Sequence, residues 1–86
     1  MSLDRLSISR GFILTLRGVD ATVRARAYAV AEALAAEFPA LPGSKDTRVL
    51  LEPVGGCWAR AVPGTIWSVL YTVGAEKVFI RSANVL

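Results

Sequence analysis

The sequence predicts a single α+β domain in which one helix packs on one face of an antiparallel sheet of four to five strands. Three features of the 86-residue chain predict this fold. Residues 5–17 alternate between apolar and polar side chains, residues 20–37 repeat apolar side chains at helical spacing, and the second half holds short apolar segments between Gly and Pro turns. A chain of this length forms one domain, so we assign residues 1–86 to it, with the elements in the order β-α-β-β-β-β.

The first expected element is a strand over residues 5–17. Between positions 6 and 17, five of the six even-numbered residues are apolar, against one of the six odd-numbered residues. A period of two is typical of a strand with one buried face. Arg10 interrupts the apolar face, and the neighbouring Gly11 marks the expected position of a β-bulge. The pattern leaves a helix over residues 9–19 open as the alternative.

A helix is predicted over residues 20–37. Asp20 is the expected N-cap, because its carboxylate would lie at the positive end of the helix. Pro39 and the Pro42-Gly43 turn end the helix. The apolar stripe consists of Val23, Ala27, Val30, Leu34 and Phe38, and the opposite face carries Ala25, Tyr28, Ala29, Glu32 and Ala36. The alanines of the opposite face have two interpretations that the sequence leaves open, namely helix propensity alone or a second face buried against a partner.

Four strands are predicted after the helix, within residues 47–52, 57–62, 65–73 and 77–81. Short Gly and Pro turns join them, so they should form an antiparallel meander. The 65–73 segment carries large apolar side chains on both faces and is expected at the centre of the sheet. Residues 82–86 are expected to form a short tail. Whether the first strand lies at an edge or pairs centrally stays open.

The composition narrows the possible chemistry. The chain has no histidine, a single cysteine (Cys57), and seven acidic residues without the spacing of a carboxylate dyad or a calcium loop. We attribute most of the acidic residues to solubility and interpret Cys57 as a small buried side chain. We therefore predict no catalytic residues, no metal and no cofactor, which favours a protein that is not an enzyme.

The chain is expected to be cytoplasmic. A membrane span needs ~20 consecutive apolar residues, whereas the longest comparable stretch, Tyr28 to Phe38, contains Glu32 and Glu37. Arg5 and Arg10 lie where the apolar region of a secretory signal would be. A single cysteine excludes an intrachain disulfide and agrees with a reducing compartment. No membrane partner is expected.

Arginine and aromatic side chains supply the candidate binding residues. The net charge is +3, and eight of the ten basic residues are arginines, which suit bidentate contacts with carboxylates and phosphates. Aromatic residues beside arginines on a sheet can stack bases or anchor a protein interface. Trp58 and Arg60 would share one face of a strand and Arg81 lies on the last strand, while Arg24 and Tyr28 form a second patch on the helix.

The final third of the chain resembles the bacterial RelE/ParE-like toxin superfamily. The resemblance is carried by the segments 56–62, 66–73 and 77–80, in which Trp58 and Arg60 precede a turn, and Tyr71 follows the pair Val69-Leu70. It implies two helices after the first strand, of which the sequence predicts only one. Ser68 stands where the ribosome-dependent members carry Arg, and the last strand lacks their further basic residues. The resemblance therefore implies a gyrase-type or other action without RNA cleavage.

Three functions follow from these features. The first is a small non-enzymatic binding protein, of the kind that phages and mobile elements use as inhibitors, which occupies a surface of a protein or ribonucleoprotein complex. The second is a RelE/ParE-like toxin of a toxin-antitoxin pair, for which a helix over residues 9–19 is the discriminating feature. The third is an RNA-binding domain that uses Trp58, Arg60 and Arg81, with binding that weakens steeply with salt. A homodimer is left open.

Overall fold

The computed structural model describes residues 5–86, which form two helices and five strands. In chain order they are β1 (Leu6–Ile8), α1 (Arg10–Arg17), α2 (Ala21–Glu37), β2 (Thr47–Leu51), β3 (Gly55–Ala61), β4 (Trp67–Val73) and β5 (Val78–Val85). The predicted α+β class is confirmed, but a second helix precedes the expected one.

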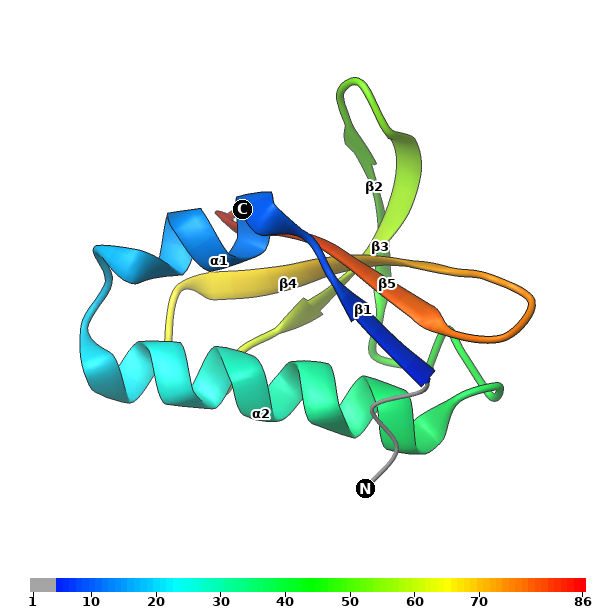
Figure 1. Ribbon diagram of the computed structural model, residues 1–86, viewed down its shortest axis with the longest axis horizontal. Coiled ribbons are helices and arrows are strands. Elements are labelled where there is room, and N and C mark those ends of the chain that lie inside the picture. The colour runs from blue at the N-terminus through cyan, green and yellow to red at the C-terminus, as the bar shows by residue number, and fades with distance from the viewer. Residues whose placement is uncertain (1–4) are drawn as a thin grey trace.

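The five strands form one mixed sheet in the order β1-β5-β4-β3-β2 (Figure 1). The last four make the predicted antiparallel meander, and β4 lies at its centre as expected. β1 lies at an edge and pairs in parallel with β5, with Leu6 opposite Val78. The expectation of a wholly antiparallel sheet is wrong at β1, because no short turn joins β1 to β5 and no hairpin fixes its direction.

The helix α2 follows its prediction. Asp20 is the N-cap, and its carboxylate accepts a 3.0 Å hydrogen bond from the backbone N–H of Thr22. The helix ends at Glu37, directly before Phe38 and Pro39. The predicted stripe faces the sheet and is buried at Ala27, Val30 and Leu34, and the neighbouring Ala31 and Ala35 are buried with it. The small residues in this stripe let the helix lie close to the strands.

Residues 10–17 form α1, so the strand predicted over 5–17 ends at Ile8 and Gly11 lies in a helix instead of a bulge. Ser9 caps the helix, because its hydroxyl accepts a 3.2 Å hydrogen bond from the N–H of Phe12. Phe12 and Leu16 are both fully buried. Apolar residues four positions apart fit a period of two and also one face of a helix, so alternation alone could not separate them.

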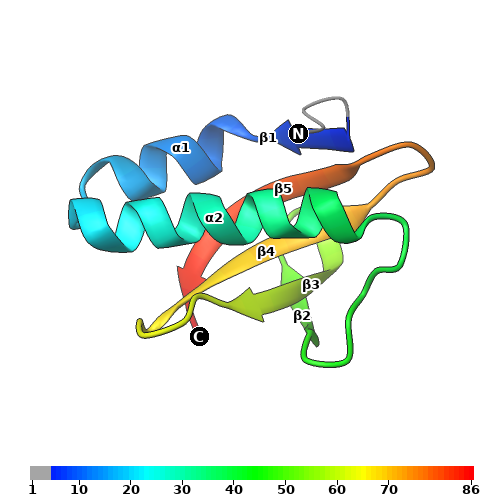
Figure 2. The same cartoon turned by 90° about the horizontal axis from the view of Figure 1, so that it is seen from below.

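Both helices lie on the same face of the sheet (Figure 2). The main core lies between the two helices and the sheet. Its buried members include Phe12, Leu16 and Leu34 from the helices and Val69, Tyr71 and Ile80 from the strands. Trp58 and Trp67 are partly buried and pack against this core. The bulk of both tryptophans therefore contributes to the stability of a domain that has few residues from which to build a core.

The other face of the sheet holds a smaller apolar cluster. Cys57, Ala59 and Leu70 are buried there, and Val49 and Leu51 pack against them. Burial raises the pKa of the Cys57 thiol, although Arg48 and Arg81 act in the opposite direction. Cys57 is thus the small buried side chain that the sequence predicts.

The strand β5 runs to Val85, so the tail expected over residues 82–86 is mostly strand. Asn84 lies opposite Ser68, and Val85 lies opposite Trp67. The prediction fails because this segment is only weakly apolar, and its strand conformation depends on hydrogen bonds to β4 that no local pattern reports.

Candidate functional site

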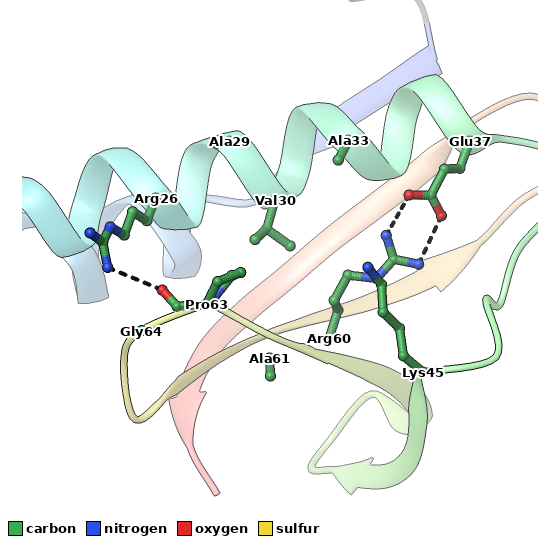
Figure 3. Close-up of a pocket in the computed structure, with 10 residues that line it drawn as sticks. All are labelled: Arg26, Ala29, Val30, Ala33, Glu37, Lys45, Arg60, Ala61, Pro63 and Gly64. Carbon is green, nitrogen blue, oxygen red and sulfur yellow. Dashed lines mark hydrogen bonds and ion pairs between the residues drawn. The ribbon is translucent and has the colours of Figure 1, made fainter.

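A groove runs between α2 and the end of β3 (Figure 3), with a volume of about 540 Å³. We call it the α2–β3 groove. The helix side is formed by Arg26, Ala29, Val30, Ala33 and Glu37, and the strand side by Arg60, Ala61, Pro63 and Gly64, with Lys45 beside Glu37 and Arg60.

Small side chains on α2 leave the space of this groove. Ala29 and Ala33 are one turn apart and therefore lie on one face of the helix. Both are exposed, whereas the neighbouring Val30 is buried. Alanine keeps the helix favourable while occupying the least volume of any side chain with a Cβ. The alanine-rich helix face that the sequence singles out therefore borders a groove at Ala29.

On the strand side of the groove, β3 has an edge that pairs with no strand, because β2 does not extend as far as β3. Thr47, the first residue of β2, lies opposite Ala59 of β3. Arg60 and Ala61 continue β3 beyond that point, with no strand pair on the β2 side. The turn at Pro63 and Gly64 then leads to β4, and Gly64 has a φ of 74°, which glycine adopts without strain.

Arg60 binds two carboxylates at one end of the groove, the end where Lys45 lies. Its Nε and Nη2 atoms donate to Asp46 at 2.7 and 2.9 Å, and its Nη1 and Nη2 atoms donate to Glu37 at 2.7 and 2.8 Å. Asp46 also accepts hydrogen bonds from the backbone N–H of Gly43, at 2.8 Å, and from the hydroxyl of Tyr71. The network joins the end of α2, the loop before β2, β3 and β4 in one place.

Burial and pairing set the protonation of these groups. Burial raises the pKa of Asp46, but the hydrogen bonds from Arg60, Tyr71 and Gly43 outweigh it and the pKa lies below its ordinary value. The hydrogen bond from Arg60 lowers the pKa of Glu37. Hydrogen bonds from Arg60 to both carboxylates raise its own pKa, and burial raises that of Tyr71. Arg60 and both carboxylates are therefore charged at neutral pH, and Tyr71 keeps its proton.

Two other cations of the groove are exposed. Arg26 donates from Nη1 to the carbonyl of Pro63 at 3.3 Å, and Lys45 lies near Glu37. Within residues 5–86, the ion pairs join Arg60 to Glu37 and Asp46 and do not include Arg26 or Lys45. Both cations are therefore exposed and lie outside these ion pairs.

The structure does not gather Trp58, Arg60 and Arg81 on one surface. Trp58 and Arg60 share the helix-covered face of β3, as expected, but only 4% of Arg60 is exposed and its donors bind inside the protein. Arg81 lies on the other face, where its Nε donates to Thr72 at 2.9 Å and its guanidinium stacks on Phe79. A partner that touches Trp58 would therefore not reach Arg81 on the same side of the sheet.

The two residues of the second predicted patch, Arg24 and Tyr28, lie close together in space. Arg24 and Tyr28 line a shallow hollow with Ile13 and Arg17. Both side chains already have partners, because Arg24 donates from Nη1 to the carbonyl of Val19 at 3.0 Å, and the Tyr28 ring packs edge-to-face on Phe12. Arg24 thereby satisfies carbonyl groups at the C-terminal end of α1.

Trp58 also has a neighbour that sequence reasoning missed. The guanidinium of Arg48 lies 5.5 Å from the centre of the Trp58 ring. This distance allows a cation–π contact. The signal for it is the register between β2 and β3, which places Arg48 opposite Trp58 and which the sequence does not report.

The groove residues Arg26, Ala33 and Lys45 were not predicted from the sequence, and neither was the role of Asp46. The side chain of Asp46 has no exposed surface, so the solubility role that we assigned to most of the acidic residues does not apply to it. The turn position indicated solvent, but two of its hydrogen-bond partners, Arg60 and Tyr71, come from strands far along the chain. The only local signal for the groove was the alanine face of α2.

The groove offers contacts for binding a partner. Its wall supplies exposed methyl groups and a strand edge, and its ends supply cations. Within the described residues, no three or more His, Cys, Asp or Glu side chains gather as metal ligands would. In the same part of the chain, neither helix is long and apolar enough to cross a membrane.

None of the family models, curated proteins or solved structures with which the chain was compared matches it. The fold and the geometry of the α2–β3 groove therefore carry the argument for function.

Proposed function

We propose that this chain is a small non-enzymatic binding protein of the cytoplasm, which acts by occupying a surface of a protein or ribonucleoprotein target through the α2–β3 groove. The observation that carries the proposal is the groove itself, in which exposed alanines lie between Arg26 and Lys45, two cations that take no part in the ion pairs of residues 5–86. Such a surface offers close apolar packing at its centre and charge at its rim, which is the usual anatomy of a protein interface.

The ion pairs at the Arg60 end of the groove support this proposal. Arg60, Glu37 and Asp46 hold one end of α2 against β3, with donor–acceptor distances of 2.7 to 2.9 Å. A groove with fixed walls loses little conformational freedom when it binds, and this favours affinity. The inhibitor type proposed from the sequence would act in this way, by covering part of its target without chemistry.

Affinity capture with a matched pair of variants tests the proposal. Ala33→Glu places a carboxylate in the groove, four residues from Glu37, and Ala36→Glu places one outside the groove, four residues from Glu32. Both exposed positions therefore gain a carboxylate four residues from another one on the same helix. We expect the wild type and Ala36→Glu to capture one stoichiometric protein complex from a nuclease-treated bacterial lysate in moderate salt, and Ala33→Glu to lose it.

Two outcomes would contradict the proposal. Equal capture by Ala33→Glu and Ala36→Glu would exclude the groove as the contact surface. Recovery of RNA alone, lost after nuclease treatment and weakened steeply by salt, would favour the RNA-binding function instead.

A RelE/ParE-like toxin is the second candidate, and one observation favours it. The helix α1, over Arg10–Arg17, together with α2, supplies the two helices after the first strand that the resemblance implies. We infer an action without RNA cleavage, because Ser68 still stands where ribosome-dependent members carry Arg. Growth arrest on expression, with gyrase or a small cognate antitoxin in the captured complex, would support this candidate; normal growth would count against it.

A further inference from the structure

The last residues of β3 form an unpaired strand edge inside the groove. The N–H of Val62 donates to the carbonyl of Trp67 at 2.8 Å, so the backbone of Val62 points toward β4. Backbone groups alternate in direction along a strand, and the N–H and C=O of Ala61 therefore point to the side where β2 has already ended. Such unpaired groups are a template for pairing with another extended chain.

The edge lies under the alanine wall of α2. Ala61 is opposite Ser68 in the β3–β4 register, and its methyl group points away from α2 (Figure 3). It is thus the backbone of Ala61 that borders the groove. A strand added beside Ala61 would continue the sheet beyond β2, and alternate side chains of that strand would pack against Ala29 and Ala33. Methyl groups at these positions leave room for them.

The charges of the groove favour an acidic occupant. Arg26, Lys45 and Arg60 are positive, and Glu37 and the buried Asp46 are negative, which leaves a balance of one positive charge. Both negative groups are bound to Arg60, at the end of the groove where Lys45 lies. The end at Arg26 has no acidic lining residue. Complementary charges steer association and select the partner.

We propose that the α2–β3 groove binds an extended, acidic segment of a partner protein, which pairs with the backbone of Ala61 as an added strand of the sheet. This inference rests on the proposed function and names the kind of partner that the groove takes. Main-chain hydrogen bonds to the strand edge would give affinity, and the alanine wall and Arg26 would select small apolar and acidic side chains.

The test uses a phage-displayed library of random dodecapeptides selected on the full chain. Synthetic copies of the enriched peptides are then titrated against the wild type and three variants. Ala61→Pro removes the N–H that faces the groove, at an edge position where a strand tolerates proline. Arg26→Glu reverses the cation at the end of the groove, and Arg10→Glu is its control on the exposed surface of α1.

We expect enriched peptides with alternating acidic and apolar residues. Ala61→Pro should weaken their binding by about 5- to 100-fold, since it leaves a carbonyl of the peptide without its donor. Arg26→Glu should weaken it by about tenfold or more, while Arg10→Glu leaves it unchanged. Far-UV circular dichroism checks that each variant keeps its fold. If Ala61→Pro unfolds, N-methylation of successive peptide amides replaces it, and only alternate positions should weaken binding.

Other outcomes would overturn the inference and separate it from the proposed function. Peptides with apolar residues at helical spacing, insensitive to Ala61→Pro, would show a helical occupant and leave the binding function intact. A dimer in sedimentation that Arg26→Glu disrupts would show that a second copy of the chain fills the groove. Absence of any enriched peptide would overturn strand addition, whereas the binding function fails only if the lysate capture also yields no partner.

Discussion

The two ends of the α2–β3 groove each carry an arginine, and the two side chains have opposite fates. Arg60, on β3, is 4% exposed and donates four hydrogen bonds to Asp46 and Glu37. Arg26, on α2, is exposed and donates one hydrogen bond, to the carbonyl of Pro63. Arg60 is a structural residue, because its loss would leave the carboxylates of Asp46 and Glu37 without their cation. Arg26 is exposed, and we propose that it binds a partner. The difference lies in their surroundings and not in the residue type.

Replacing Arg60 should have the largest effect on stability. Arg60→Met keeps much of the aliphatic length but leaves the buried carboxylate of Asp46 without its cation. We expect a loss of about 3–5 kcal/mol in the free energy of unfolding, as is typical when one partner of a buried ion pair is removed. Urea denaturation at pH 7 measures it. A loss below about 1 kcal/mol would mean that water compensates Asp46 and that the end of the groove is not rigidly held.

Tyr71→Phe should have a smaller effect of the same kind. The change removes only the hydroxyl that donates to Asp46, which keeps its bonds from Arg60 and Gly43. We expect a loss of about 1.5–3 kcal/mol, the range for a hydrogen bond to a charged group. The same urea titration measures it. A variant as stable as the wild type would show that the tyrosine contributes through its buried ring alone.

Acid should weaken the Arg60 end of the groove selectively. The pKa values of Asp46 and Glu37 are lowered from ordinary values of 3.8 and 4.5. The unfolded chain therefore binds more protons than the folded protein as the pH falls below about 4.5, and stability contributed by both groups is fully present above this pH and lost below it. Urea titrations between pH 7 and pH 3 should show a shallower decline for Asp46→Asn than for the wild type. Equal slopes would contradict the assignment.

Replacing Arg26 should have the smallest effect on stability. Arg26→Ala removes one long hydrogen bond at the surface, so we expect a change within about 0.5 kcal/mol in the free energy of unfolding. Together with the loss of peptide binding expected for Arg26→Glu, this result would separate the structural arginine from the binding one. Destabilisation comparable to that of Arg60→Met would remove the contrast between the two ends of the groove.

The helices show how far local sequence signals reach. α2 was predictable because Asp20, the apolar stripe and Pro39 agree on one period and on both ends. α1 was not predictable, since the apolar residues from Leu6 to Leu16 fit both the period of a strand and one face of a helix. The change from strand to helix occurs at Ser9. Its hydroxyl caps α1 and also donates to the carbonyl of Arg81 in β5, at 2.7 Å. A contact across 72 residues leaves no trace in a local pattern.

The candidate site was predictable only in part. The alanine face of α2 was visible in the sequence as an unusual surface, and the groove borders it at Ala29, but Ala33 was not part of the predicted face. The opposite wall exists because β2 begins only at Thr47, opposite Ala59, while β3 continues to Ala61, and this offset is a matter of strand register. Register is fixed by side-chain packing across the sheet, so residues 47–61 could be assigned as strands without revealing the edge.

Local sequence signals were sufficient to predict the α+β class, the extent of α2, the antiparallel meander with β4 at its centre and the burial of Cys57. These features follow from periodicity, caps and turns, which act over a few residues. Contacts between distant segments account for the helical state of residues 10–17, the parallel pairing of β1, the burial of Asp46 and the burial of Arg60 in contrast to the exposed Arg26. Arg60 meets Asp46 and Glu37 across 14 and 23 residues. Whether a charged side chain is buried or free depends on which distant groups fold against it.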